Sequence, residues 1–557
     1  MPYVPTQGYT GLTQQTRLVI EQNQGEQLML AQTPSAATMS LTNQPNTSGM
    51  ATTGGRLHFF IIGNTGSGNI VITGTNVSGS PLTSQTYHVG IAPLNAQGFT
   101  EFTTTELFAT VNSGGIALSS GLTTNGCQIM VFASPGGKIL VPCEIDVEEH
   151  IGKFNPADRR GILAKDFRIQ QTHKWATLDK FDSSVYPDQL WMLYMLLTNN
   201  PTVTTVPAAP PTLLAATTKA STMTLTTAPT TPGMFLIFAL AGNSVAGTIV
   251  LSGTDIFGNS QSETITVAAN NNTVYSTKRY SALTSPASNQ FTTTGLSAGA
   301  TIAVTGVYAW TYTGTWDGIN NITKSTATLE IFDGVQGVVL PFTHFEEGTF
   351  SWEKEKEITF SGKGQAQDFQ IVGDPNPTGA YPSGTNPFTT LAQPTSMPMA
   401  GFPAQFWLDA LPGTPFTTQD GELLSLKIML GTGLKGFYVG DGMQRWSNLT
   451  YGGEPDVTLD ATIVYQSYQK YLQYFKPNAK FALGVFFQGN LLGTISNTTY
   501  FEGIKFVFPV KIDTFKPDRG KDPVEATLKL MNEYDFQSLG YLFQMSMTAQ
   551  VPPTYTN

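Results

Sequence analysis

Charge is what this sequence has least of. Asp, Glu, Lys and Arg together make up 12% of its 557 residues, whereas an average globular chain contains roughly a quarter. The few charges are mainly acidic, and the formal net charge is −10. The chain therefore lacks the excess of Lys and Arg with which nucleic-acid-binding proteins neutralise phosphates. Its charge instead suits a surface along which a polyanion passes without binding.

Cysteines and long apolar runs are also scarce. Cys127 and Cys143 are the two cysteines, too few for a disulfide scaffold, and we expect both to be buried free thiols. No run approaches the roughly 20 apolar residues that cross a bilayer. The first 15 residues show neither the basic segment nor the apolar segment of a signal peptide. We therefore expect a protein that is made in a cytoplasm and does not enter a membrane.

Glycine and proline are abundant, with 55 and 34 residues. They lie, with Thr, Ser and Asn, between short β-rich apolar runs such as 57–62, 70–72 and 129–132. Short strands separated by turn residues are typical of β-sandwiches. At about 150 residues per domain, the length predicts three to five domains. The predicted fold class is therefore mainly β.

An internal duplication divides the chain. The run 70–76 (IVITGTN) returns as 249–255 (IVLSGTD), and the hexapeptide 186–191 (YPDQLW) returns as 402–407 (FPAQFW). Proline is tolerated in the first turn of a helix, so both hexapeptides are predicted to begin a short helix that packs on a sheet. We expect Trp191 and Trp407 to be buried in equivalent surroundings.

Six segments follow from this repeat. They are an N-terminal arm (1–25), β-sandwich A (26–133), a charged β-rich segment with a helix at 187–198 (134–206), β-sandwich B (207–313), a second such segment with a helix at 403–411 (314–412), and a C-terminal portion (413–557). We expect the arm to order against a neighbouring subunit or to fray. In the second charged segment, charges alternate along a predicted strand at 352–358. The C-terminal portion is predicted to contain strands at 423–430 and 456–464 and a helix at 465–475.

No motif indicates catalysis, a cofactor or a metal. Gly431 to Gly436 fits the glycine pattern of a dinucleotide site, but a strand-like run follows where the pyrophosphate needs a helix, so these are turn glycines. Glu148, Glu149 and His150 resemble metal ligands, as do His344, Glu346 and Glu347, but the histidines are not equivalent in the two copies. His58 and His88 lie among apolar residues and are interpreted as structural. We therefore expect no enzyme and no site residues.

The region from about 327 to 557 resembles the tail tube proteins of long, non-contractile-tailed bacteriophages. The resemblance depends on the charged strand 350–360, the Pro403 helix start, the strand 424–428 followed by 451–459 (YGGEPDVTL), and the late runs 506–510, 524–528 and 532–535. It implies tube-type β-sandwich or barrel domains with short flanking helices, decorated here by two Ig-like sandwiches. It also implies trimeric or hexameric homo-oligomeric rings that contact other tail proteins and stack into a tube in the virion, assembled in the host cytoplasm, through which genomic DNA is ejected.

Two other functions stay open. One is a different virion β-protein, such as a distal-tail, decoration or adhesion component. The other is a carbohydrate-active enzyme with Ig-like accessory modules, which would need two carboxylates across a cleft.

Overall fold

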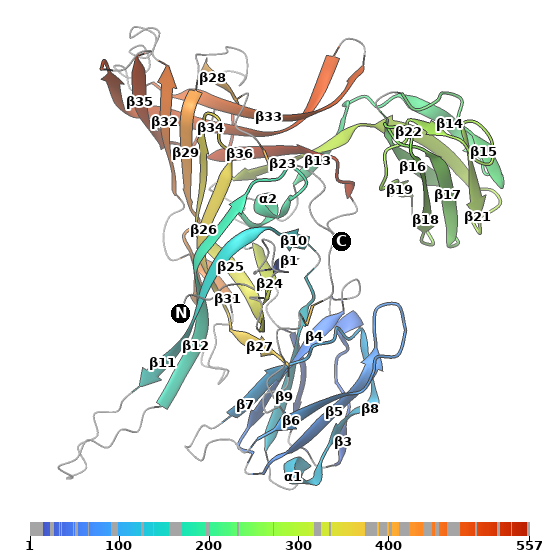
Figure 1. The fold of residues 1–557 in the computed structure, drawn as a ribbon, viewed down its shortest axis with the longest axis vertical. Helices are drawn as coiled ribbons and strands as arrows, with labels where there is room; N and C mark the ends of the chain where they lie inside the picture. The colour runs from blue at the N-terminus through green and yellow to red at the C-terminus, as the bar shows by residue number, and fades with distance from the viewer. Residues whose placement is uncertain are drawn as a thin grey trace, which may run out of the picture.

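The protein is mainly β, as predicted. A computed structural model describes the chain except residues 1–14, 91–98, 155–169, 317–324, 374–386, 389–397, 412–422, 438–447, 465–478 and shorter stretches of at most four residues. Strands make up 65% and helices 3% of the described residues. A central body carries sandwich A at one end of the long axis and sandwich B at its side (Figure 1). None of the described helices has the length and hydropathy to cross a membrane.

Sandwich A consists of two four-stranded sheets around one apolar core. One sheet has the order β2 (Gln27–Gln32), β9 (Gln128–Pro135), β4 (Gly55–Ile62), β7 (Phe99–Thr103). The other has the order β3 (Thr38–Met39), β8 (Thr110–Leu118), β5 (Gly68–Thr75), β6 (Gln85–Val89). The short elements η1 (Pro45–Thr47) and α1 (Ser120–Thr123) lie between strands.

Sandwich B repeats this arrangement around its own core. Its sheets have the orders β14 (Thr212–Thr218), β22 (Thr301–Val307), β16 (Phe235–Ala241), β19 (Thr273–Tyr275), and β15 (Thr222–Thr224), β21 (Gln290–Thr294), β17 (Gly247–Thr254), β18 (Ser260–Val267). The additional strand β20 (Ala282–Leu283) pairs with β17. The sequence repeat therefore corresponds to the same strand order in space.

That order distinguishes two kinds of sandwich. When the strands of each sandwich are numbered 1 to 8 in chain order, leaving out β20, one sheet has the strand order 1-8-3-6. The facing sheet has the order 2-7-4-5. Eight strands in two Greek keys form a jelly roll. An immunoglobulin sheet instead pairs its first and second strands. The β-sandwich prediction holds, while the strand order differs from the Ig-like one that the resemblance implied.

Each sandwich is inserted between two strands of the body that pair with each other. Sandwich A lies between β1 (Gln15–Gln22) and β10 (Ile139–Val141). Sandwich B lies between β13 (Thr202–Val206) and β23 (Ala309–Trp316). The two ends of each insertion are therefore close together, which lets a compact domain be inserted without disturbing its host. The described part of the predicted arm, β1, pairs with β24 (Ser325–Phe332) of the same chain.

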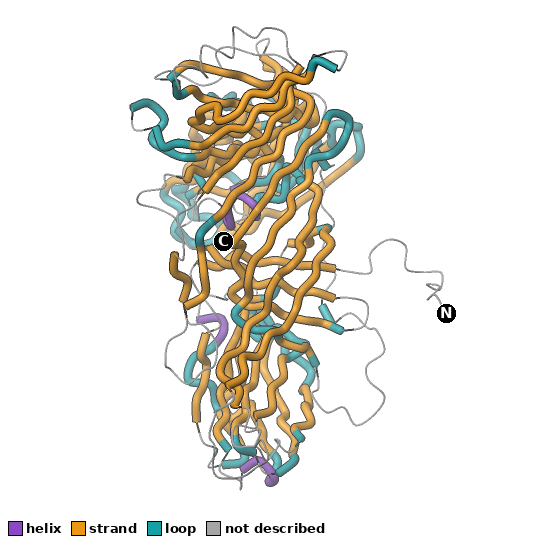
Figure 2. Tube along the Cα trace, turned by 90° about the vertical axis from the view of Figure 1, so that its left-hand side faces the viewer, coloured by secondary structure: helices purple, strands orange, loops and turns teal. Residues whose placement is uncertain are grey.

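The body joins both halves of the chain in one set of sheets. The hairpin of β11 (Cys143–Phe154) and β12 (Gln170–Ser184) pairs through β12 with β26 (Thr359–Ala366). From there, β25 (Gly337–Glu353), β29 (Leu423–Gly431), β32 (Asp456–Val464), β35 (Glu525–Asn532), β34 (Thr498–Asp518), β36 (Phe543–Ala549) and β23 follow in turn. Several of these strands run side by side along the molecule (Figure 2).

Strand β25 belongs to two sheets. Its first part pairs with β24 and β27 (Gln370–Val372), and its second part pairs with β26 and β29. The change occurs near Phe342, which has a positive φ of 51°, and the register with β24 shifts at the same place. An irregularity of this kind bends a strand and re-aims its side chains. It lets β25 connect the sheet that meets sandwich A to the sheet of the body.

Of the two helices predicted to begin at the repeated hexapeptides, one exists. Helix α2 spans Trp191–Leu196, and all six of its side chains are buried. It contacts β1, β23, β24, β25 and β36, so it lies inside the body (Figure 1). A helix that is apolar all round needs such an enclosed place. The prediction of 187–198 was therefore right in type, while residues 186–190 form the preceding turn.

The predicted helix at 403–411 is wrong. Residues Ala404–Ala410 form strand β28, which pairs with β33 (Phe481–Ile495). Phe406 and Leu408 are buried, whereas Trp407 between them is half-buried. From Gln405 to Leu408, less buried and buried residues alternate with the period of a strand, and a strand partner is available. Trp191 and Trp407 consequently lie in different surroundings, and the expectation that they are equivalent is also wrong.

The charged strand predicted at 352–358 is a turn for most of its length. Strand β25 ends at Glu353 and β26 begins at Thr359. Between them Glu355 has a φ of 72°, which a continuous strand cannot contain. Strands near the predicted 423–430 and 456–464 are present as β29 and β32. The predicted helix at 465–475 lies outside the described residues.

Candidate functional site at the junctions of sandwich and body

The acidic clusters seen in the sequence do not assemble into a site. On β11, the side chains of Glu148 and His150 are 67% and 31% exposed, and His150 stacks on Trp175 with ring centroids 5.1 Å apart. In the other copy, His344 is fully buried while Glu347 is exposed. Among the described residues, neither group gathers three metal-ligating atoms.

The remaining sequence candidates are structural. Strand β29 ends at Gly431, and strand β30 (Leu434–Phe437), which pairs with β31 (Asn448–Tyr451), begins within the glycine motif. Gly433 lies between the two strands with a φ of 67°. The prediction of turn glycines is therefore correct for Gly433, whereas Gly431 and Gly436 belong to strands. Cys127 and Cys143 are free thiols, the first buried and the second half-buried. Burial raises the pKa of the Cys127 thiol, which makes it inert rather than reactive.

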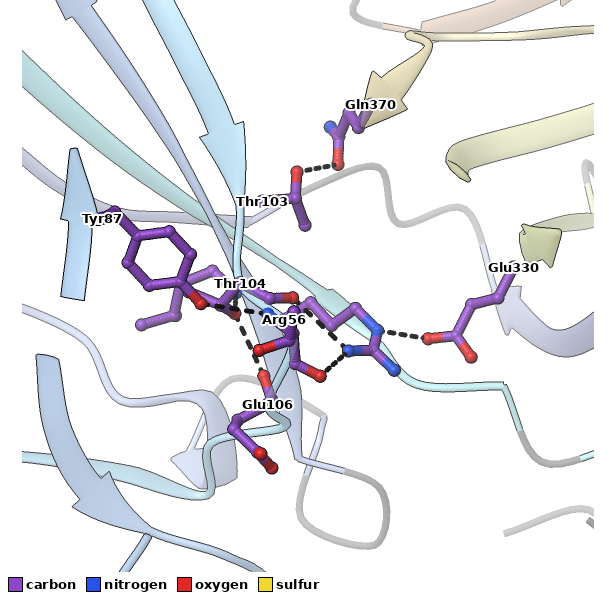
Figure 3. Close-up of polar contacts among 9 residues, drawn as sticks. Arg56, Tyr87, Thr103, Thr104, Glu106, Glu330 and Gln370 are labelled. Atoms are coloured by element: carbon purple, nitrogen blue, oxygen red, sulfur yellow. Dashed lines mark hydrogen bonds and ion pairs between the residues drawn. The ribbon is translucent and has the colours of Figure 1, made fainter. Parts of the chain in front are cut away.

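The structure instead gathers polar side chains where sandwich A meets the body. Arg56 on β4 forms an ion pair with Glu330 on β24, with Nε 2.6 Å from Oε1. The two residues are 2% and 1% exposed. The Arg56 guanidinium also donates to the carbonyl oxygens of Thr104 and Thr105 and lies over the ring of Phe388. These contacts hold the Arg56 guanidinium between sandwich A and the body (Figure 3).

A second set of contacts continues the junction along β4. The Thr103 hydroxyl donates to Oε1 of Gln370 on β27 at 3.3 Å (Figure 3). The side-chain amide of Gln370 also lies 3.0 Å from Nδ1 of His58. Val372 and Thr103 form a parallel bridge between β27 and β7. The junction therefore extends a sheet of the sandwich into a sheet of the body.

Three ligand-type side chains lie within this junction. His58, Glu101 on β7 and Asp368 each offer one nitrogen or oxygen atom, and these atoms lie within 4.8 Å of one another. His58 Nε2 is 3.5 Å from Oε2 of Glu101. No other group of three His, Cys, Asp or Glu side chains in the described part of the chain comes as close.

Sandwich B is held at its own junction by Arg279. Its guanidinium donates to the carbonyl oxygens of Gly233 and Leu492 and to the side chain of Gln550, all at 2.8–3.1 Å. It also lies 5.8 Å from the centre of the Tyr308 ring. Leu492 lies in the hairpin of β33 and β34. This hairpin of the body therefore contacts sandwich B, which projects from the body (Figure 1).

Sequence reasoning missed both junctions. The sequence indicates only a structural histidine at His58, and no local motif includes Arg56 or Glu101. Their partners Glu330 and Asp368 lie 274 and 267 positions further along the chain, so no local spacing reveals the contacts. The sequence feature that could have indicated the junction is that Arg56 and Glu101 are isolated charges within an apolar sandwich. Charged residues in an apolar sandwich are costly to bury unless they are paired.

Burial of His344 predicts acid sensitivity. Burial lowers the pKa of His344 to about 3, below the value of about 6.5 in an unfolded chain. Its contribution to stability is therefore complete above pH 6.5 and is lost as the pH falls towards 3, by at most about 1.4 kcal/mol per pH unit. We expect the melting temperature of His344→Gln, followed by tryptophan fluorescence, to fall less than that of the wild type between pH 7.5 and pH 5. Equal falls would contradict this role.

Comparisons with known proteins identify no family. No family model matches the chain, and no curated protein matches it. Among solved structures, the PBSX exported protein XepA is 11% identical, with 52% of this chain and 86% of that one covered and a TM-score of 0.11. The VP2 subviral particle of infectious bursal disease virus is 10% identical, with 65% and 78% covered and a TM-score of 0.08. Similarities this weak carry no argument about function.

Proposed function

We propose that this protein is a structural virion protein whose copies assemble into stacked rings that form a phage tail tube, a conduit for DNA ejection. The proposal includes no catalytic role. It starts from the resemblance of residues 327–557 to tail tube proteins, and one structural observation supports it most strongly. This observation is a strand edge with which no other described strand pairs, on a hairpin that extends beyond the body.

The open edge belongs to β11. This strand of 12 residues pairs with β12 along its length, and no second strand of the described chain is in register with it. The hairpin projects from the body at the side opposite sandwich B (Figure 1). An exposed edge presents unpaired N–H and C=O groups that pair readily with another chain. A ring of subunits would close such edges against one another, as barrels do.

Charge and topology are consistent with this role. A net charge of −10 repels a nucleic acid over about 8–10 Å at physiological salt, which a conduit requires. The two sandwiches are inserted between paired strands of the body, so they add bulk outside the sheet without interrupting it. Assembly would also stabilise the long-stranded body by mass action.

Two adjacent proline variants in β11 test the proposal. Neighbouring residues of a strand direct their N–H groups to opposite edges, so Glu148→Pro and Glu149→Pro each remove a donor from a different edge. Hydrogen exchange identifies the variant that keeps the β11–β12 ladder. We expect that variant to remain folded but to sediment as a monomer where the wild type forms rings. Assembly of both variants at wild-type concentrations would contradict edge pairing.

A second candidate function is an adhesion or decoration component of the virion. It is favoured by the jelly-roll strand order, which occurs in lectin domains, and by Phe257, which is 82% exposed in the turn between β17 and β18. Asp255 fixes this turn by accepting hydrogen bonds from the backbone of Phe257 and Asn259 at 2.8 Å. Copy number separates the candidates, because a tube subunit is present in many tens of copies per particle and a tail-tip component in only a few.

A further inference from the structure

We propose that the junction between sandwich A and the body is a binding site for a divalent transition-metal ion of the Zn²⁺ type, with His58, Glu101 and Asp368 as ligands. The donor atoms of the three side chains lie within 4.8 Å of one another. His58 and Asp368 are 1% and 3% exposed, and the side chain of Glu101 is 27% exposed. The site is thus nearly enclosed and keeps one side open for entry. The inference is independent of the proposed tube function.

The fold places the three ligands from three separate elements. His58 is paired with Thr103 across β4 and β7, and Glu101 lies two residues before Thr103, on the same face of β7. Asp368 lies two residues before Gln370, whose amide contacts His58. Two ligands therefore belong to sandwich A and the third belongs to the body, so a bound ion would bridge the two units.

A supporting shell orients the imidazole. The contact of Gln370 with Nδ1 directs Nε2 of His58 towards Glu101. A metal ligand needs a bare Nε2, with the proton on Nδ1 donated to an acceptor. The Gln370 amide can supply that acceptor by reversing, because the Thr103 hydroxyl that now donates to Oε1 can accept from the amide nitrogen equally well.

Charge balance favours a doubly charged cation. Two carboxylates meet one imidazole here, and Arg56, two residues away on β4, is engaged by Glu330 at 2.6 Å. Carboxylates taken out of water require compensation by a nearby positive charge. One imidazole nitrogen and two carboxylate oxygens suit Zn²⁺, which takes mixed N and O ligands in a tetrahedral set. Mg²⁺ prefers oxygen ligands alone and retains its waters.

Only a small adjustment is required. Ligands about 2.0–2.1 Å from a tetrahedral ion lie roughly 3.4 Å from one another, compared with the 4.8 Å that encloses the three donor atoms now. Rotation of the two carboxylate side chains can close this difference while the backbone of the junction stays in place. The fourth position would hold a water molecule on the side where Glu101 is exposed.

Calorimetric titration of the metal-stripped full chain with zinc sulfate tests the proposal. We expect one Zn²⁺ per chain, and at least 10-fold weaker binding for His58→Gln, Glu101→Gln and Asp368→Asn. His150→Gln is the matched control, because it removes a half-buried histidine beside Glu148, away from the junction, and it should bind as the wild type does. Absence of stoichiometric binding, or equal affinity in the wild type and Asp368→Asn, would overturn the proposal.

A second readout excludes simple misfolding of the variants. Zn²⁺ should slow hydrogen exchange in β4, β7 and β27 of the wild type, and Mg²⁺ should not. Asp368→Asn should show the wild-type exchange pattern without metal and no added protection with Zn²⁺. Protection by Zn²⁺ in this variant, or its absence in the wild type, would place the ion elsewhere and refute the site.

Discussion

Replacing Glu330 by alanine is expected to destabilise the docking of sandwich A by about 3–5 kcal/mol. Glu330 is 1% exposed, and its carboxylate holds the equally buried Arg56 at 2.6 Å. Removal of one partner of a buried ion pair leaves the other charge uncompensated, which costs far more than the pair itself contributes. The measurement is the hydrogen-exchange protection of β4 and β24, because the junction can open without global unfolding.

Two further variants test whether the loss comes from the uncompensated buried charge. The double variant Arg56→Met with Glu330→Leu should recover much of the loss, since an apolar pair of similar volume avoids the stranded charge. Glu353→Ala is the exposed control, because its ion pair with Lys356 has side chains that are 59% and 69% exposed, and such pairs contribute at most about 1 kcal/mol. Equal effects of Glu330→Ala and Glu353→Ala would show that the buried pair does not hold the junction.

Replacing Trp191 by alanine is expected to destabilise the body by about 3–5 kcal/mol. The Trp191 ring is fully buried, and it packs against Phe181, Phe345 and Phe360 with centroids 5.3–6.1 Å apart. These aromatic residues come from β12, β25 and β26, so the indole fills the space where both halves of the chain meet. Urea unfolding followed by circular dichroism measures the loss.

Trp407→Ala is the matched variant for this second prediction. It removes the same side chain from the repeated hexapeptide, but at a half-buried position on β28. We expect it to cost clearly less than Trp191→Ala, because less of the ring leaves an apolar contact. Equal losses would restore the equivalence that the hexapeptides suggested and would contradict the different surroundings that the structure gives them.

Local sequence patterns predict most of the strands, because the alternation of apolar and polar residues along a strand involves only neighbouring residues. Strands β29 and β32 follow from their own sequences, and the buried helix α2 follows from its unbroken apolar run. Strand β28 does not, since the pairing of Ala404–Ala410 with β33 depends on residues about 80 positions away. Long-range pairing overrides local preference in such segments.

The candidate site was beyond local reasoning for a related reason. His58 and Glu101 lie on neighbouring strands of one sandwich, and the repeat pattern placed both there. Asp368 and Glu330 arrive from the body only because sandwich A is inserted between β1 and β10. Strand order, including the jelly-roll order of the two sandwiches, is fixed by pairings between distant segments, and composition and turn spacing do not encode it.

Electron microscopy of the purified, concentrated protein tests the central claim most directly. If β11 pairs between subunits in a tail tube, images should show rings with a central opening, in three-fold or six-fold arrangements, that stack into hollow tubes with the sandwiches on the outside. Particles that stay monomeric at every concentration and salt condition tried would contradict the account.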